Sequence, residues 1–132
     1  MAKPNVMTTA MALGFLAVST LSAAAFEKKS FDAAAFKAAQ GAGGPVLVHV
    51  TAPWCPTCKA QHQALGDLEK KPEFAKLVVF DVDFDSQKDA LKSFNATSQS
   101  TLIVFKGATE TGRSVGVTAA PAIAELLATA AK

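Results

Sequence analysis

The sequence predicts an α/β fold with a mixed central β-sheet flanked by helices on both faces. Two observations support this prediction. Apolar, strand-like runs alternate along the chain with segments of helical periodicity, which is typical of parallel strands joined by crossover helices. Two strands and a helix then follow one another at the end of the chain, which adds an antiparallel pair to the sheet. A length of 132 residues corresponds to one domain.

The first 25 residues have the pattern of a secretory signal peptide. Lys3 gives a weakly positive start, an apolar run follows over 11–21, and small residues occupy 22–25. We expect cleavage after Ala25, a mature domain over 26–132, and a periplasmic or otherwise exported location. An uncleaved membrane anchor is the alternative, but the apolar run is shorter than the roughly 20 residues of a spanning helix.

The first half of the mature chain contains two predicted strand–helix units. A short edge strand over 26–29 precedes an alanine-rich helix over 32–40, with Ser30 or Asp32 near its cap. The run PVLVHV over 45–50 is apolar apart from one histidine, which is typical of a buried parallel strand. A helix is expected from about Cys55 to Glu69, and Pro72 closes that region.

The second half continues the alternation and ends with an antiparallel pair. Ser86 and Thr118 are expected to cap the helices that follow them. The apolar run LVVFDVDF and the run TLIVF are the strongest strand signals of this half. The predicted elements are strands over 77–84, 101–105 and 110–117 and helices over 87–94 and 119–131.

Composition excludes several classes of function. Lys and Arg number 13 against 11 Asp and Glu, and no basic run exceeds two residues, so no nucleic-acid partner is expected. Only two cysteines are present, which excludes a multi-bridge disulfide framework and a four-cysteine zinc site. The alternation of Asp81, Asp83 and Asp85 lacks the glycine and terminal glutamate of an EF-hand, so Asp83 and Asp85 are interpreted as solvated charges at a strand end. No cofactor and no metal site are expected.

The two cysteines form a Cys-x-x-Cys pair where a buried strand leads into a helix. Cys55 heads the helix, where unpaired backbone N–H groups and the helix dipole stabilise a thiolate. Pro56 suits the first helical turn, and Cys58 lies one turn on, within reach of a mixed disulfide on Cys55. Trp54 offers an apolar surface beside them. A pair that closes so small a ring stabilises little of the chain, so redox chemistry is the expected role.

The chain resembles the thioredoxin family over essentially the whole mature region. The resemblance is carried by VLVHVTAPWCPTCK over 46–59, by TLIVFK over Thr101–Lys106, and by Gly116. It implies a thioredoxin fold and a thiol–disulfide oxidoreductase acting on protein thiols and disulfides. It also implies that Cys55 is the exposed attacking cysteine and Cys58 the buried resolving one. The implied substrate-binding residues are Trp54, Pro56, Thr57, Ser100, Thr101 and Gly116.

One departure from the family pattern concerns the residue before the TLIVF strand. Family members usually carry a cis-proline there, and this chain has Ser100. A cis bond before a residue other than proline costs roughly 3–4 kcal/mol, so the Gln99–Ser100 peptide is expected to be trans. The loop that faces the cysteines should therefore differ in shape, which puts backbone pairing with substrate at this loop in doubt.

A second departure concerns a buried charged pair. Thioredoxins have an Asp below the resolving cysteine and a Lys on the neighbouring strand, whereas the matching positions here hold His49 and Asp81. A histidine with a carboxylate neighbour can take the proton from Cys58 during exchange, so both residues are predicted to be catalytic. A purely structural His–Asp hydrogen bond is the alternative. His62, four residues after Cys58, is interpreted as a packing residue.

Three functions fit the sequence, and the least favoured of them is a binding module whose disulfide never turns over. The first is an exported thiol–disulfide oxidoreductase, acting as a reductase or electron shuttle because Pro56 and Thr57, between the cysteines, are uncharged. Such a protein is expected to be monomeric, and the resemblance suggests a membrane thiol transporter as its electron donor. The alternative is a carrier of copper or another metal that uses the cysteine pair plus a histidine, since soft ligands suit Cu(I).

Overall fold

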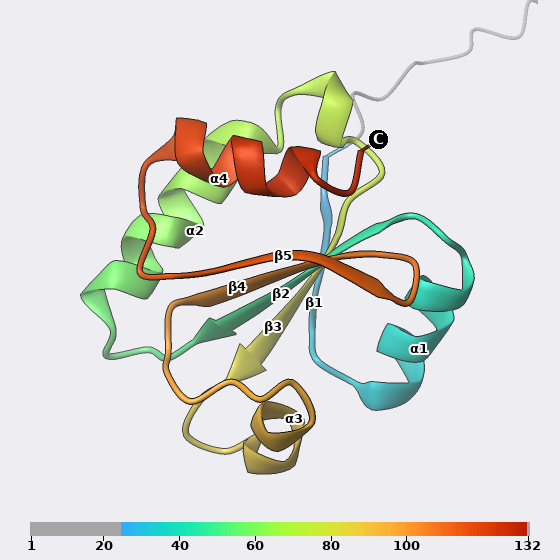
Figure 1. Ribbon diagram of the computed structural model, residues 1–132. Coiled ribbons are helices and arrows are strands. Elements are labelled where there is room, and N and C mark those ends of the chain that lie inside the picture. The colour runs from blue at the N-terminus through green and yellow to red at the C-terminus, as the bar shows by residue number, and fades with distance from the viewer. Residues whose placement is uncertain (1–24, 132) are drawn as a thin grey trace, which may run out of the picture.

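The computed structural model describes residues 25–131 and confirms the predicted α/β architecture (Figure 1). The strands are β1 (Glu27–Ser30), β2 (Pro45–Thr51), β3 (Val78–Asp83), β4 (Thr101–Lys106) and β5 (Thr109–Val115). The helices are α1 (Ala33–Gly41), α2 (Pro56–Leu68), α3 (Lys88–Ser93) and α4 (Ala120–Ala128), with a 3-10 turn over Pro72–Phe74. The predicted signal segment, 1–25, lies outside the described residues apart from Ala25. Within 25–131, no helix combines the length and apolarity needed to cross a membrane.

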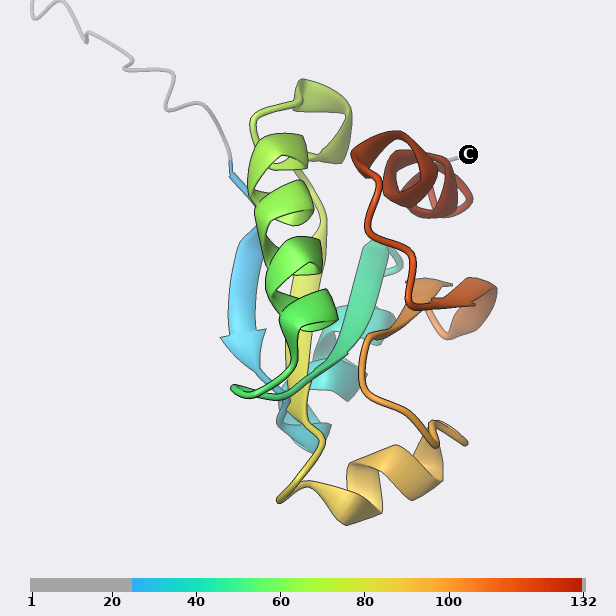
Figure 2. The ribbon, with the colours of Figure 1, turned by 90° about the vertical axis from the view of Figure 1, so that its left-hand side faces the viewer.

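The sheet is five-stranded and mixed, in the order β1-β3-β2-β4-β5. Strands β1, β3 and β2 are parallel, and β4 and β5 continue the sheet in antiparallel pairing. Helices α2 and α4 cover one face, and α1 and α3 cover the other (Figure 1). Figure 2 shows α2 running along the strands while α4 is seen almost end-on. This arrangement places the start of α2 at the end of the central strand β2.

The alternation of side chains along β2 divides the core into two layers. Val46, Val48 and Val50 face α1 and α3, where they pack with a group of aromatic rings. Leu47 lies on the other face, in the cluster that includes α2 and α4. His49 shares that face, because side chains two positions apart on a strand point the same way. Ring centroids 5.2 to 6.2 Å apart connect Phe31, Phe36, Phe80, Phe94 and Phe105.

Only one of the predicted helix caps forms as expected. Asp32 caps α1 by accepting a hydrogen bond of 2.8 Å from the Ala35 N–H. Ser86 does not cap α3, because its hydroxyl donates a hydrogen bond to Asp83 instead. Thr118 does not cap α4, which has Ala119 at its N-cap and ends at Ala128, three residues before the predicted end. The Ser86 hydroxyl is engaged elsewhere, which residue type alone does not reveal.

Gly116 adopts a conformation that only glycine tolerates well. Its φ of 78° lies in the left-handed region, and its N–H donates to the carbonyl of Ser100 at 3.0 Å. We expect Gly116→Ala to lower the free energy of unfolding by about 1–2 kcal/mol, because the added Cβ is strained at this φ. Gly66→Ala is the matched control. Gly66 lies in α2 with open space where an added Cβ would stand, so alanine there should stabilise the protein by about 0.5–1 kcal/mol. Urea unfolding of both variants checks this, and equal effects of the same sign would contradict it.

Candidate functional site

Cys55 and Cys58 form a disulfide at the N-terminus of α2. Cys55 is the N-cap residue, and its Sγ accepts a hydrogen bond of 3.1 Å from the Cys58 N–H. The relative exposures are 4% for Cys55 and 1% for Cys58, so the expectation that Cys55 is exposed is wrong for the oxidised pair, which is almost entirely covered. The backbone N–H and the positive end of the helix dipole both favour negative charge on the Cys55 sulfur after reduction.

Cys55 is the cysteine that reaches a surface hollow. The hollow has a volume of about 360 Å³ and lies beside the loop between β2 and α2. Its lining includes Cys55 but not Cys58, in agreement with the order of the two exposures. This placement supports attack by Cys55, whose role stays a prediction. The remaining lining residues are Thr51, Ala52, Pro53, Lys59, His62 and Asp83.

The Ser100 hydroxyl is the polar side-chain group in contact with both sulfurs. Its Oγ lies 3.2 Å from the Sγ of Cys55 and 3.2 Å from the Sγ of Cys58, and the residue is 4% exposed. Sulfurs in a disulfide carry no proton, so the hydroxyl, with its single proton, is the donor to one or the other. Within 25–131 no peptide bond is cis, so the Gln99–Ser100 bond is trans, as predicted. Ser100 has a φ of 62°, in the left-handed region, and with this backbone its side chain reaches the disulfide.

The backbone of Ser100 is fully engaged inside the protein. Its N–H donates to the carbonyl of Val50 at 2.8 Å, and its carbonyl accepts from Gly116 N–H and from the Gln61 side chain, each at 3.0 Å. A substrate backbone would have to displace one of these bonds in order to pair with Ser100. The predicted difference in shape from the family loop stays a prediction.

The predicted substrate-binding residues divide into an exposed set and a buried set. Trp54 is 57% exposed, Pro56 and Gly116 are exposed, and Thr57 is half-buried. Ser100 and Thr101 are buried, and the Thr101 hydroxyl donates to the carbonyl of Ser98. The buried pair offers no side-chain surface to a partner protein. Ser100 contacts the sulfurs instead, which sequence reasoning did not anticipate.

The exposed indole of Trp54 is held in place by Asp85. Its Nε1–H donates to Asp85 Oδ2 at 2.8 Å, and its ring lies edge-on to Phe84 at 6.5 Å between centroids. Asp83 Oδ1 accepts from the Ser86 N–H, the Ser86 hydroxyl and the Asp85 N–H. The Ser86 hydroxyl bond in particular lowers the pKa of Asp83. Asp83 and Asp85 lie at the end of β3 in contact with solvent, as the sequence indicated, and they also shape the turn that fixes Trp54.

Asp85→Ala tests this support of Trp54. Loss of the carboxylate frees an indole that has one ring neighbour, so we expect a several-fold higher KM for a protein disulfide and little change in kcat. The chain has one tryptophan, so its fluorescence anisotropy should fall in the same variant. Asp67→Ala, at an exposed position on α2, is the control and should leave both quantities unchanged. Unchanged anisotropy in Asp85→Ala would show that the hydrogen bond does not restrain the ring.

His49 and Asp81 face each other on adjacent parallel strands, in paired register, as the strand alignment predicted. His49 Nδ1 lies 3.1 Å from Asp81 Oδ1, and the His49 side chain has no exposed surface. His49 Nε2 lies 3.0 Å from Gln61 Oε1. Cys58 Sγ contacts the Ser100 hydroxyl and, at 4.0 Å, the carbonyl of Val50. Direct transfer of the Cys58 proton to His49 stays a prediction that these contacts do not favour.

Gln61 connects the His–Asp pair to the redox loop, and sequence reasoning missed it. The residue is fully buried, and its Nε2 donates to the carbonyls of Ser100 and Val117 at 3.0 and 2.9 Å. The available signal was helical spacing: Gln61 follows Cys58 by three positions and precedes Leu65 by four, on the buried face of α2. A polar residue on such a face needs buried partners.

His62 lies next to this network at the protein surface. Its ring packs edge-on against His49 with 4.6 Å between centroids, and its Nε2 lies 3.1 Å from the Thr51 hydroxyl. Partial burial lowers the pKa of His62, and the neighbouring His49 lowers it further. The ring therefore has the packing contact that the sequence suggested, although the residue as a whole is exposed.

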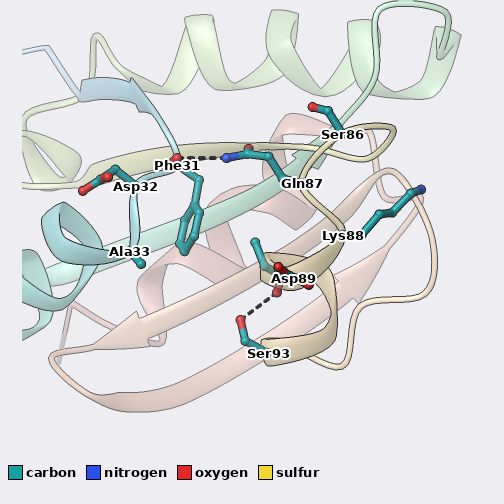
Figure 3. A pocket seen from close by; sticks show the side chains of 9 residues that line it. Phe31, Asp32, Ala33, Ser86, Gln87, Lys88, Asp89 and Ser93 are labelled. Atoms are coloured by element: carbon teal, nitrogen blue, oxygen red, sulfur yellow. Dashed lines mark hydrogen bonds between the residues drawn. The ribbon is translucent and has the colours of Figure 1, made fainter.

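Another hollow, of about 520 Å³, lies between α3 and the segment that leads from β1 into α1 (Figure 3). Gln87 crosses this region, because its Nε2 donates to the carbonyl of Phe31 at 3.0 Å while its Oε1 accepts from Asp83 N–H at 2.9 Å. These bonds tie the start of α1 to the end of β3. The lining contains neither cysteine nor histidine, so the hollow is separate from the dithiol chemistry.

Comparison with known proteins agrees with this geometry. The sequence model of the thioredoxin family matches residues 22–129. The solved structure of Trxlp from Edwardsiella tarda EIB202 is 44% identical, with a TM-score of 0.75, over 76% of this chain and 98% of that one.

Two curated relatives extend the comparison. Thiol:disulfide interchange protein DsbE of Vibrio cholerae is 35% identical over 70% of this chain and 47% of the relative, so this chain spans about half of its length. A thioredoxin of Echinococcus granulosus is 32% identical over 67% of this chain and 80% of the relative. By sequence, fold and the position of its Cys-x-x-Cys pair, the chain belongs to the thioredoxin family of thiol–disulfide oxidoreductases.

Proposed function

We propose that this protein is an exported reductase or electron shuttle that acts on protein disulfides through Cys55 and Cys58. The observation that carries the proposal is the placement of Cys55. It caps α2, it lines the hollow of about 360 Å³, and it directly follows the exposed Trp54. A protein disulfide can therefore meet a sulfur whose negative charge the helix N-terminus stabilises.

The exchange reaction follows from the two sulfur positions. In the reduced protein, the Cys55 thiolate attacks a substrate disulfide, forms a mixed disulfide and releases one substrate thiolate. Cys58 then loses its proton and attacks Cys55 Sγ, which releases the second substrate thiol and leaves the Cys55–Cys58 disulfide. Ser100 Oγ, 3.2 Å from each sulfur in the oxidised state, can donate to whichever sulfur carries the charge.

The direction of electron flow is proposed from the residues between the cysteines. Pro56 and Thr57 carry no charge, so the reduced thiolate lacks the extra stabilisation that a strong oxidant needs. Relatives named thiol:disulfide interchange protein, at 35% and 37% identity, support a role in exchange. The signal pattern of residues 1–25 supports export. Outside the cytoplasm the oxidised pair needs a source of electrons, and a membrane thiol transporter would supply them.

The partner surface is proposed around Trp54 and Val115. These are the large hydrophobic side chains that stand exposed within residues 25–131, at 57% and 59%. Trp54 precedes Cys55, and Val115 pairs with Thr101 next to the Gly116–Ser100 hydrogen bond. The two side chains thus come from the segments that adjoin the disulfide.

The copper-carrier alternative gains no comparable support. The described side chains that lie close enough together to hold a metal are His and Asp residues, and neither cysteine is among them.

An insulin reduction assay tests the activity. The purified protein should accelerate the reduction of insulin by dithiothreitol, and it should oxidise a reduced dithiol peptide much more slowly. The opposite order of the two rates would overturn the reductase direction.

Cell fractionation with N-terminal sequencing tests export, for which we expect an extracytoplasmic protein that starts at Phe26. An intact N-terminus in the cytoplasm would contradict it. Thiol trapping in cells with and without a membrane thiol transporter tests the electron donor.

A further inference from the structure

We propose that His49, His62 and Asp81 form a binding site for one divalent metal ion of the zinc class, distinct from the dithiol. His49 and Asp81 come from the paired strands β2 and β3, and His62 comes from α2, which packs over them. One ligand atom from each residue lies within 4.8 Å of the others. Two imidazole nitrogens and one carboxylate oxygen are a donor set that Zn²⁺ accepts.

The hydrogen bonds of Gln61 determine which nitrogen of His49 carries a proton. Gln61 Nε2 faces two backbone carbonyls, of Ser100 and Val117, so the amide cannot be turned around without placing oxygen against oxygen. Its Oε1 therefore faces His49 Nε2, 3.0 Å away, and that nitrogen must be the donor. In a neutral imidazole, the lone pair then belongs to Nδ1.

The Nδ1 lone pair points at a carboxylate. His49 Nδ1 lies 3.1 Å from Asp81 Oδ1. A lone pair and a carboxylate oxygen repel one another, so a proton or a metal ion must lie between these two atoms. A second ring proton meets the requirement, and so does a metal ion bound to both atoms. Gln61 then plays the part of the outer partner that fixes the tautomer and orientation of a ligating histidine.

His62 supplies the third ligand and lies on the side of the site that is open to solvent. Its ring lies against the His49 ring and is held through Nε2 by the hydroxyl of Thr51, a bond that a small rotation of an exposed side chain can break. Asp81 is 33% exposed at its side chain, so an ion can enter between the two residues. Lys28 is the cation that acts on His62 from β1, and its charge is paired with Glu69. Three protein ligands leave a fourth, tetrahedral position open to water.

Metal titration of the oxidised protein tests the site. The experiment uses tag-free protein with the Cys55–Cys58 disulfide intact, so that no thiol competes for the ion. Isothermal titration with Zn²⁺ should give one site per chain, and Co²⁺ should give the visible absorption bands of a tetrahedral complex. His62→Ala should weaken Zn²⁺ binding by more than about 100-fold, at least as much as the loss of an outer partner does. Gln63→Ala, an exposed neighbour on α2, should bind like the parent protein.

Asp81→Asn adds a second variant that keeps the size of the side chain and removes its charge, and it should also abolish the Co²⁺ bands. No binding of Zn²⁺ or Co²⁺ by the oxidised parent protein would overturn the proposal and leave a proton as the charge between His49 and Asp81. Binding that His62→Ala and Asp81→Asn leave unchanged would also overturn it, because the ion would then sit elsewhere. Since His62 is exposed, its replacement avoids a failure to fold.

Discussion

Replacing Cys55 by serine should abolish disulfide reduction, whereas replacing Cys58 by serine should stop the reaction one step later. Cys55 lines the surface hollow and caps α2, so its loss removes the attacking sulfur. Cys58 lies inside the first turn at 1% exposure, so its loss leaves the first attack intact and blocks resolution. Non-reducing electrophoresis should show a mixed disulfide accumulating only in Cys58→Ser.

The same pair of variants can contradict the assignment of roles. A mixed disulfide that accumulates in Cys55→Ser and not in Cys58→Ser would reverse the two cysteines. Limited alkylation of the reduced parent protein provides an independent check, because Cys55 should be labelled first. Circular dichroism of both variants serves as the control for folding, since loss of a disulfide that closes so small a ring should change stability little.

Ser100→Ala should slow resolution of the mixed disulfide by about 10- to 150-fold. The Ser100 hydroxyl lies 3.2 Å from both sulfurs, and a hydrogen bond to a charged group contributes about 1.5–3 kcal/mol, which corresponds to this factor. The position is almost fully buried, so water does not readily replace the hydroxyl. Stopped-flow measurement of a trapped mixed disulfide gives the rate directly.

Ser100→Gly is the matched control, because Ser100 has a φ of 62° that strains alanine but suits glycine. Both variants lose the hydroxyl, and only alanine carries the backbone strain, so similar slowing in both would assign the effect to the hydroxyl. A normal rate in Ser100→Gly would assign the slowing to backbone strain instead.

Ser100→Pro changes the backbone as well as the side chain. It removes the N–H that donates to Val50 and demands a negative φ, so it should alter both substrate affinity and rate.

Several features of the redox site are encoded locally in the sequence. The spacing of Cys55 and Cys58, the strand before them and Pro56 after Cys55 are local features, and local features decide where a helix begins. The pairing of His49 with Asp81 was also predictable, because two apolar strands that are each interrupted by a polar residue can be aligned by their patterns. The trans peptide at Ser100 followed from the cost of the cis form.

Other features of the site depend on residues far apart in the chain. Ser100 lies 45 and 42 positions from the two cysteines, and its hydroxyl reaches them only because β4 pairs with β2. Trp54 and Asp85 meet for a similar reason, through the ends of β2 and β3. Ser86 and Thr118 look like helix caps in the sequence, but in the structure neither caps its helix. Residue type defines what a side chain is able to bind, and its neighbours decide what it does bind.

The sequence by itself determined the α/β class, the five strands in order and the position of the Cys-x-x-Cys pair at a helix start, because periodicity and local sterics encode these. Only the tertiary structure decided that Gln61 links the His49–Asp81 pair to the Ser100 loop. It alone also brought His62 against His49. The physical reason is that a buried polar group must find its partners within about 3 Å, and packing between α2 and the sheet decides which atoms lie at that distance.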